Sequence, residues 1–167
     1  QKYAYNTEDL NTLTGIFTAI AGKIGDLFSV QPQKIVDTID PRFELTEVGL
    51  NQLVNNCHLG IGTIIKNSDG LKEITWKDSK TQEELGKVTI IKNSNGSTTI
   101  TWTGNAAKIG NAEADNENDR GWKASFQIKA KDDFIGGNMV PTNGSDSGIC
   151  LDDDTTRKFE QPSVNVK

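Results

Sequence analysis

The amino-acid sequence predicts a mainly β protein, a β-sandwich preceded by one N-terminal α-helix. Apolar residues near the N-terminus recur at steps of three and four, whereas beyond residue 31 they alternate with polar residues. Hydrophobic residues make up only 34% of the 167 residues, and 16 glycines accompany many Asn, Thr and Ser residues, which favours a chain rich in turns. Because strands and helices do not alternate, the sequence argues against a parallel α/β fold.

The first expected element is a helix over residues 7–28. Its apolar residues fall on one helical face: Leu10, Leu13, Phe17, Ile20, Ile24 and Leu27. Asn6 or Thr7 can cap the first turn, where the positive end of the helix dipole favours the negative charge of Glu8. Pro32 ends the segment.

Two short strands follow, over residues 34–39 and 43–45, separated by the break at Pro41. An internal repeat comes next: residues 63–76 have the sequence TIIKNSDGLKEITW and residues 89–102 have TIIKNSNGSTTITW. Each copy consists of an apolar strand, a turn rich in Asn, Ser and Gly, and a returning strand, which is the pattern of a β-hairpin. We therefore expect two similar hairpins in one sheet system.

Trp76 and Trp102 occupy equivalent positions in the two copies. We expect them to anchor the core or the space between the sheets. The alternative is that they are exposed and stack against the rings of a carbohydrate ligand.

The C-terminal half contains two long polar segments, residues 104–121 and 131–148, which we expect to be loops. Between them, residues 122–130 alternate as a half-buried strand. A short strand over residues 149–151 and a last strand after Pro162 complete the expected fold.

Composition excludes several classes of function. A net charge of −5 and the absence of a basic stripe argue against a nucleic-acid partner. No apolar run approaches the roughly 20 residues of a membrane helix, so no membrane partner is expected. The chain begins at Gln1 without a signal peptide, and we expect it to be a fragment of a longer protein.

The two cysteines, Cys57 and Cys150, are too few and too far apart in sequence for a zinc site. They are either two buried thiols or one disulfide, and we expect them to approach each other across neighbouring strands. The only histidine, His58, follows Cys57 directly. Neighbouring residues of a strand point to opposite faces, so we expect no catalytic Cys–His pair here.

No metal site or cofactor is expected. Residues 115–119 carry acidic side chains at every second position, as in a calcium loop. However, Arg120 stands where such a loop needs glycine, and Phe126 where it needs its last acidic ligand. A solvated acidic loop is the simpler interpretation of this segment and of residues 152–154.

One combination of residues suggests chemistry. Asp37 lies between apolar neighbours in its strand, and Asn165 lies between two valines in the terminal strand. If both are buried on adjacent strands, a neutral lysine amine can attack the Asn165 carboxamide while a protonated Asp37 transfers protons and ammonia leaves. The product is an amide cross-link between two side chains.

Three segments resemble a known family: IVDTIDPRFEL at residues 35–45, IGGNMVPTNGSDSGI at residues 135–149, and the terminal FEQPSVNVK. They are similar to the Ig-like domain that follows a von Willebrand factor A domain in Gram-positive pilus tip adhesins and related wall-anchored surface proteins. YAYNTEDLNTLTGIFTAIAGKI, residues 3–24, resembles the last helix of such an A domain. The resemblance implies a boundary between residues 1–30, the end of the A domain, and residues 31–167, an Ig-like sandwich of the CnaA type.

Domains of this family often carry a Lys–Asn isopeptide bond assisted by an acidic residue. The resemblance thus makes Asn165 the acceptor and Asp37 the assisting acid. It places the donor lysine on a strand before the A domain, outside this chain, because Lys34 lies too close to Asp37 on the same strand. The A domain's metal-binding Asp-x-Ser-x-Ser motif is also absent.

The function that the resemblance implies is that of an extracellular stalk module in a cell-wall-anchored adhesin, with no catalytic turnover. Its partners would be the A domain and donor strand of the parent protein and, through that parent, a host matrix or cell-surface ligand. The alternative function is a carbohydrate-binding β-sandwich that uses exposed Trp76 and Trp102.

Overall fold

The protein is described by a computed structural model over residues 4–7, 13–19, 32–110, 121–134, 137–141, 144, 147–151, 156–158 and 163–166. Its described part is mainly β, as the sequence predicts, with strands in three sheets. One α-helix, α1 (Glu47–Asn55), and one short 3-10 helix, η3 (Asn105–Ala107), accompany them. Among the described residues, no helix has the length and apolar character needed to cross a membrane.

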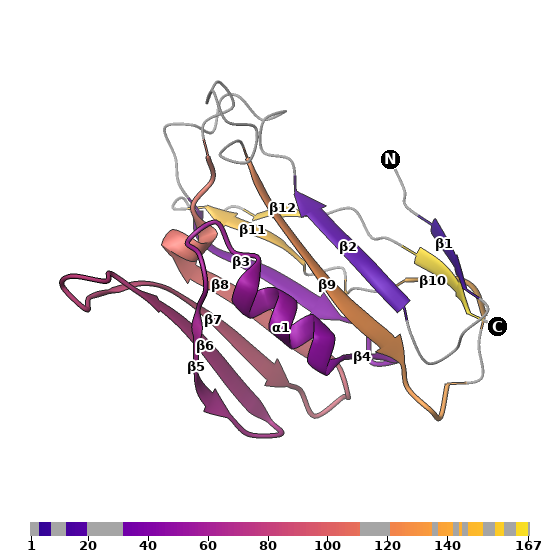
Figure 1. The fold of residues 1–167 in the computed structure, drawn as a ribbon. Coiled ribbons are helices and arrows are strands. Elements are labelled where there is room, and N and C mark those ends of the chain that lie inside the picture. The colour runs from indigo at the N-terminus through magenta and orange to yellow at the C-terminus, as the bar shows by residue number, and fades with distance from the viewer. Residues whose placement is uncertain are drawn as a thin grey trace.

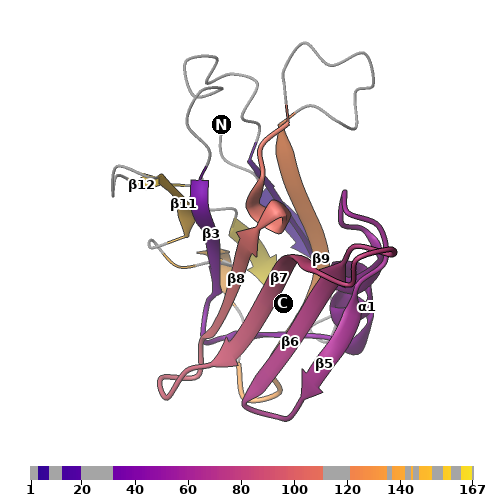
Figure 2. The same ribbon diagram turned by 90° about the vertical axis from the view of Figure 1, so that its left-hand side faces the viewer.

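The largest sheet has seven strands, all paired antiparallel (Figure 2). Their spatial order is β12 (Thr156–Lys158), β11 (Gly148–Leu151), β3 (Pro32–Ile39), β8 (Thr98–Gly104), β7 (Glu84–Lys92), β6 (Leu71–Lys77) and β5 (Thr63–Asn67). The strands from β5 to β8 are consecutive in sequence, whereas β3 and β11 come from distant parts of the chain.

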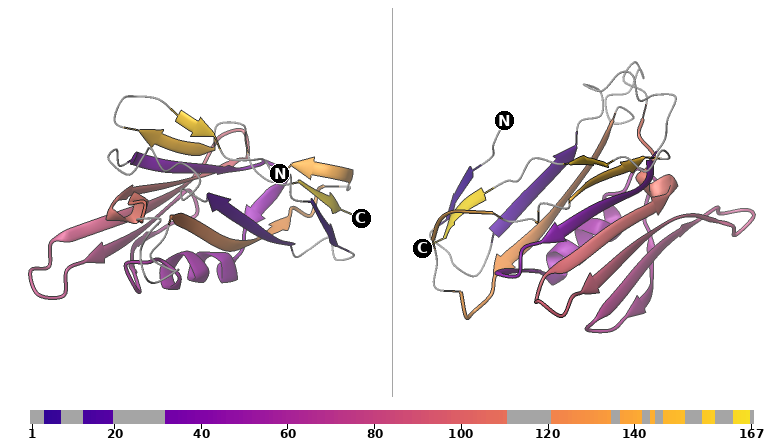
Figure 3. Two further views of the ribbon diagram at one scale, coloured as in Figure 1. Left: turned by 90° about the horizontal axis from the view of Figure 1, so that it is seen from above. Right: turned by 180° about the vertical axis from the view of Figure 1, so that it is seen from behind.

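Two smaller sheets complete the fold (Figures 1 and 3). One contains β2 (Leu13–Ala19), β9 (Trp122–Ala130) and β4 (Phe43–Leu45), with β9 in the middle. The other contains β1 (Ala4–Thr7), β13 (Ser163–Val166) and β10 (Gly137–Pro141), with β13 in the middle. β1 runs parallel to β13, and the remaining pairs are antiparallel.

A common core joins one face of the seven-stranded sheet to α1 and to the sheet of β9 (Figure 1). Its largest fully buried side chains are Phe43, Phe126, Ile35, Ile39, Ile74, Ile100, Ile128, Ile149 and Val88. The ring of Trp102 on β8 meets that of Trp122 on β9 edge to face, with centroids 5.0 Å apart and planes at 82°. Such contacts hold the two sheets together, because burial of aromatic and branched side chains is the main stabilising term in a core.

The predicted pair of hairpins is confirmed. β5 pairs with β6 and β7 pairs with β8, each through a tight turn. Gly96 in the second turn has a φ of 89°, a conformation that glycine adopts without strain. Ile74 and Ile100, which correspond in the repeat, are both fully buried.

The predicted helix over residues 7–28 is wrong at its centre, because Leu13–Ala19 forms strand β2 and pairs with β9 along seven positions. Thr14, Ile16 and Thr18 are β-branched residues, which favour a strand. Apart from Thr7, which ends β1, the rest of the predicted range lies outside the described residues.

The described helix α1 lies in a stretch for which the sequence predicts no element. Thr46 caps it, since its Oγ1 accepts the Gly49 amide at 3.0 Å. Leu50 and Leu53 turn toward the core and are almost fully buried. Gly49 is required by close packing, because a Cβ atom there would overlap the backbone oxygen of Gln127 on β9.

The corner between β3 and β4 is held by a paired ion contact. Nε of Arg42 donates to Oδ1 of Asp40 at 2.7 Å, and a second guanidinium nitrogen donates to Oδ2 at 2.8 Å. The guanidinium lies 5.9 Å from the ring centre of Phe134. This bidentate ion pair fixes the turn around Pro41.

Candidate functional site

Asp37 is fully buried on β3, as the sequence predicts. Side chains of a strand alternate between faces, so Asp37 shares its face with Ile35 and Ile39, which are also fully buried. Its register partner on β8 is Ile100, another core residue. A carboxyl group in such apolar surroundings is disfavoured in its charged form.

Ser147 holds the Asp37 carboxyl group. Its Oγ donates to Oδ1 of Asp37 at 3.0 Å and accepts the amide of Thr38 at 2.9 Å. Ser147 is itself only 1% exposed. The sequence did not single out this serine, although it lies in one of the three segments that carry the family resemblance.

The segment between β10 and β11 is anchored to the end of β3 by a second contact. The Gly144 amide donates to the Thr38 oxygen at 2.6 Å, and the Ser147 amide donates to the Gly144 oxygen at 3.2 Å. Pro141, only three residues before Gly144, pairs with Ser163 on β13. This segment therefore connects the strand of Asp37 to the strand of Asn165.

Asn165 lies on β13, the predicted terminal strand. The expectation that Asp37 and Asn165 occupy adjacent strands is wrong, because β3 pairs with β8 and β11, whereas β13 pairs with β1 and β10. The structure describes the strand of Asn165 but not the direction of its side chain, so its role as the acceptor stays a prediction.

β13 has no open edge to which a further donor strand could be added, because β1 and β10 flank it on both sides. In the parallel register, Asn6 of β1 stands opposite Asn165. β1 has the sequence AYNT and carries no lysine. Lys34 is exposed on β3, which does not suit a donor that must be neutral.

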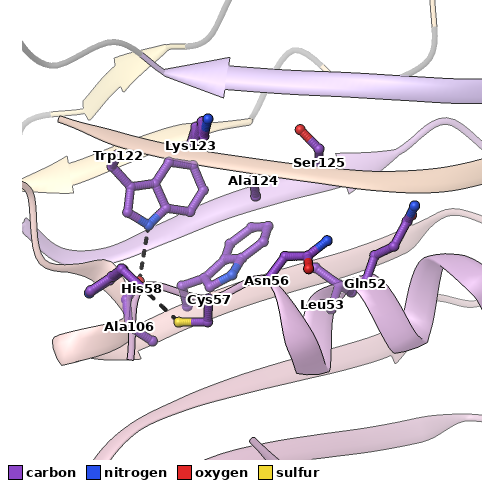
Figure 4. Close-up of a pocket in the computed structure, with 11 residues that line it drawn as sticks. Gln52, Leu53, Asn56, Cys57, His58, Ala106, Trp122, Lys123, Ala124 and Ser125 are labelled. Atoms are coloured by element: carbon purple, nitrogen blue, oxygen red, sulfur yellow. Dashed lines mark hydrogen bonds between the residues drawn. The ribbon is translucent and has the colours of Figure 1, made fainter. Parts of the chain in front are cut away.

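A small cavity of about 30 Å³ lies between the end of α1 and strand β9 (Figure 4). Cys57 and His58 line it together, and Trp102 and Trp122 form part of its wall. The sequence-based argument against their contact is wrong, because residues 57 and 58 lie in a turn and not in a strand. Burial raises the pKa of the Cys57 thiol, which opposes its use as a thiolate nucleophile at neutral pH.

The disulfide considered between Cys57 and Cys150 is not formed. Cys57 follows α1 and makes an isolated bridge with Gly60. Cys150 lies on β11, where its register partners are Lys34 and Thr156. The two cysteines thus belong to different parts of the fold, and the predicted approach across neighbouring strands is wrong.

The tryptophans are buried, which removes the basis of the carbohydrate-binding alternative. Trp76 is 2% exposed and Trp102 is 4% exposed. Nε1 of Trp76 donates to the Gly60 oxygen at 3.1 Å, so its polar edge is also engaged within the protein. Rings in this setting cannot stack on a sugar from solvent.

The acidic segments at residues 111–120 and 152–155 lie outside the described residues. Within the described part of the chain, no group of three or more His, Cys, Asp or Glu side chains is arranged to hold a metal ion. Comparison with protein-family models, with curated proteins and with solved structures finds no match to this chain.

Proposed function

We propose that the chain is an Ig-like stalk module of a Gram-positive pilus or wall-anchored adhesin, stabilised by a Lys–Asn isopeptide bond whose lysine lies outside the chain. It holds a ligand-binding domain away from the cell wall and catalyses no turnover. Asn165 is the acceptor and Asp37 is the assisting acid. The module lies outside the cell.

The observation that carries this proposal is the full burial of Asp37 between Ile35 and Ile39, with Ser147 hydrogen-bonded to Oδ1. An acidic side chain is rarely buried unless it has a specific role or partner. For amide formation the acid must be protonated at the start, so that it can donate to the carboxamide oxygen and later return a proton to the leaving ammonia. An apolar setting favours that state.

The parallel pairing of β1 with β13 supports a specific place for the donor. A lysine opposite Asn165 on a paired strand must lie in the place of β1 or on β10, and β1 has Asn6 at that position. In the parent protein, the donor strand would replace β1, whose four paired residues make a short interface.

The substitution Asn6→Lys tests the chemistry within this chain. It places an amine opposite Asn165, since directly paired residues of neighbouring strands point to the same face with Cβ atoms about 5 Å apart. We expect the intact mass to fall by one ammonia molecule relative to the calculated mass. Peptide mapping should then find residues 6 and 165 in one branched peptide.

Three variants serve as controls. Thr7→Lys directs the amine to the other face of the sheet and should give no cross-link. Asn6→Lys with Asn165→Ala should also give none, and Asn6→Lys with Asp37→Ala should react much more slowly. A folded Asn6→Lys variant that keeps its full mass after prolonged incubation would overturn the proposal, as would equal rates with and without Asp37.

A further inference from the structure

Cys57 and His58 line the cavity beside α1 and bring together a thiol and an imidazole, two groups that can bind metal ions (Figure 4). Sγ of Cys57 lies 4.0 Å from Nδ1 of His58. The other ring nitrogen, Nε2, lies 2.8 Å from the backbone oxygen of Asn105. Because a carbonyl oxygen only accepts, Nε2 carries the proton of the neutral ring, and the lone pair of Nδ1 faces the sulfur.

The turn that carries the pair is held by backbone contacts on both sides. The Asn56 amide donates to the Gln52 oxygen at 3.0 Å, and the Gly60 amide donates to the Cys57 oxygen at 2.9 Å. The Gly62 amide donates to the Val54 oxygen at 2.9 Å. A site whose backbone is already fixed loses little freedom when it binds a ligand.

The number and chemistry of the donor atoms indicate the kind of ion. Within the described residues, no group of three or more His, Cys, Asp or Glu side chains is arranged to hold a metal ion, so the pair offers two ligands. Two ligands suit an ion of low coordination number, and thiolate ligands favour Cu(I) over harder ions.

We propose that Cys57 and His58 bind one soft monovalent cation, Cu(I) or Ag(I), between Sγ and Nδ1. The Cys57 thiol loses its proton to solvent as the metal–sulfur bond forms, and Nδ1 donates its lone pair. The Asn105 oxygen keeps the imidazole in the correct tautomer, as outer-shell partners do in metal sites. The cavity of about 30 Å³ has room for the ion and one water ligand.

Competition between the reduced protein and a coloured Cu(I) chelator, without oxygen, tests the proposal. We expect one Cu(I) per chain in the wild-type protein and in Cys150→Ser. Cys57→Ser should bind none, and His58→Gln should bind at least about tenfold more weakly, which is the effect of losing even an outer-shell partner. Zn²⁺, which prefers four ligands, should compete poorly.

Nuclear magnetic resonance with Ag(I) identifies the nitrogen. His58 is the only histidine in the sequence, so its ring gives a single set of nitrogen signals. We expect Nδ1 to shift on addition of one equivalent while Nε2 stays protonated. Equal affinity in His58→Gln, a shift at Nε2 alone, or loss of the metal in Cys150→Ser would each overturn the site. Thermal unfolding of each variant shows that the fold is retained.

Discussion

The hydroxyl oxygen of Ser147 lies 3.0 Å from Oδ1 of Asp37, although 110 positions of sequence separate the two residues. The same oxygen accepts the Thr38 amide at 2.9 Å. One buried hydroxyl group therefore orients the acid and fastens the segment between β10 and β11 to the end of β3.

Replacing this hydroxyl should be costly. In Ser147→Ala, the Thr38 amide and the Asp37 carboxyl both lose a buried partner, so we expect the free energy of unfolding to fall by about 1–3 kcal/mol. Urea unfolding measures the change. Ser79→Ala, at an exposed position, should stay within about 0.5 kcal/mol of the wild type. Equal stabilities of the two variants would mean that the Ser147 contacts are not formed in solution.

Two glycines of the first hairpin, one just before β5 and one in its turn, should respond differently to substitution by alanine. A Cβ atom at Gly62 would lie 2.6 Å from Cγ2 of Ile74 and 2.8 Å from Cε2 of Trp76, whereas one at Gly70 would meet nothing within 4 Å. We expect Gly62→Ala to lose about 1–3 kcal/mol of stability through overpacking. Gly70→Ala should be neutral or slightly stabilising, because it only restricts the unfolded chain. Thermal unfolding of both variants checks this, and a stable Gly62→Ala would contradict the packing around Trp76.

The Asp40–Arg42 pair predicts a dependence of stability on pH. Burial alone would raise the pKa of Asp40, but hydrogen bonds and the positive charge of Arg42 outweigh it, so the pKa lies below its ordinary value. A carboxyl group with a lowered pKa stabilises the fold fully above its unfolded pKa of about 3.9, and this stabilisation is lost as the pH falls through the lower folded value.

We therefore expect the wild-type protein to exceed Asp40→Asn in free energy of unfolding at pH 6, with the difference shrinking below about pH 4. Chemical denaturation at several pH values measures it. Asp132→Asn removes the same formal charge at an exposed position of the neighbouring turn and corrects for net charge. A difference that does not change between pH 6 and pH 3 would show that Arg42 does not hold Asp40 in solution.

Much of the β structure could be predicted, because its signals are local. The repeat fixes two hairpins through its turn residues, and residues 122–130 form β9 as their alternation predicts. The burial of Asp37 follows from its place between Ile35 and Ile39. In each case, a few neighbouring residues carry the whole pattern.

The errors have physical causes that local patterns do not contain. Leu13 and Phe17 fit a helical face, but they also fit one face of a strand, and pairing with β9 decides between them. The glycine inside α1 disfavours a helix locally, yet Gly49 allows the close approach to Gln127 that stabilises α1. The contact of Ser147 with Asp37 depends on distant segments. The approach of Cys57 to His58 depends on a turn in which Gly60 has a φ of 97°.

The parallel pairing of β1 with β13 has a mechanical consequence. Tension that enters at Ala4 and leaves at Val166 pulls the two strands in opposite directions along their shared axis. The hydrogen bonds between them are then loaded in shear and must break together. Strands that are pulled apart from one end instead lose their hydrogen bonds one after another. Under force, the rate of unfolding decides how long a protein stays folded. The strand pair that is loaded in shear therefore lies where the two ends of the described chain meet.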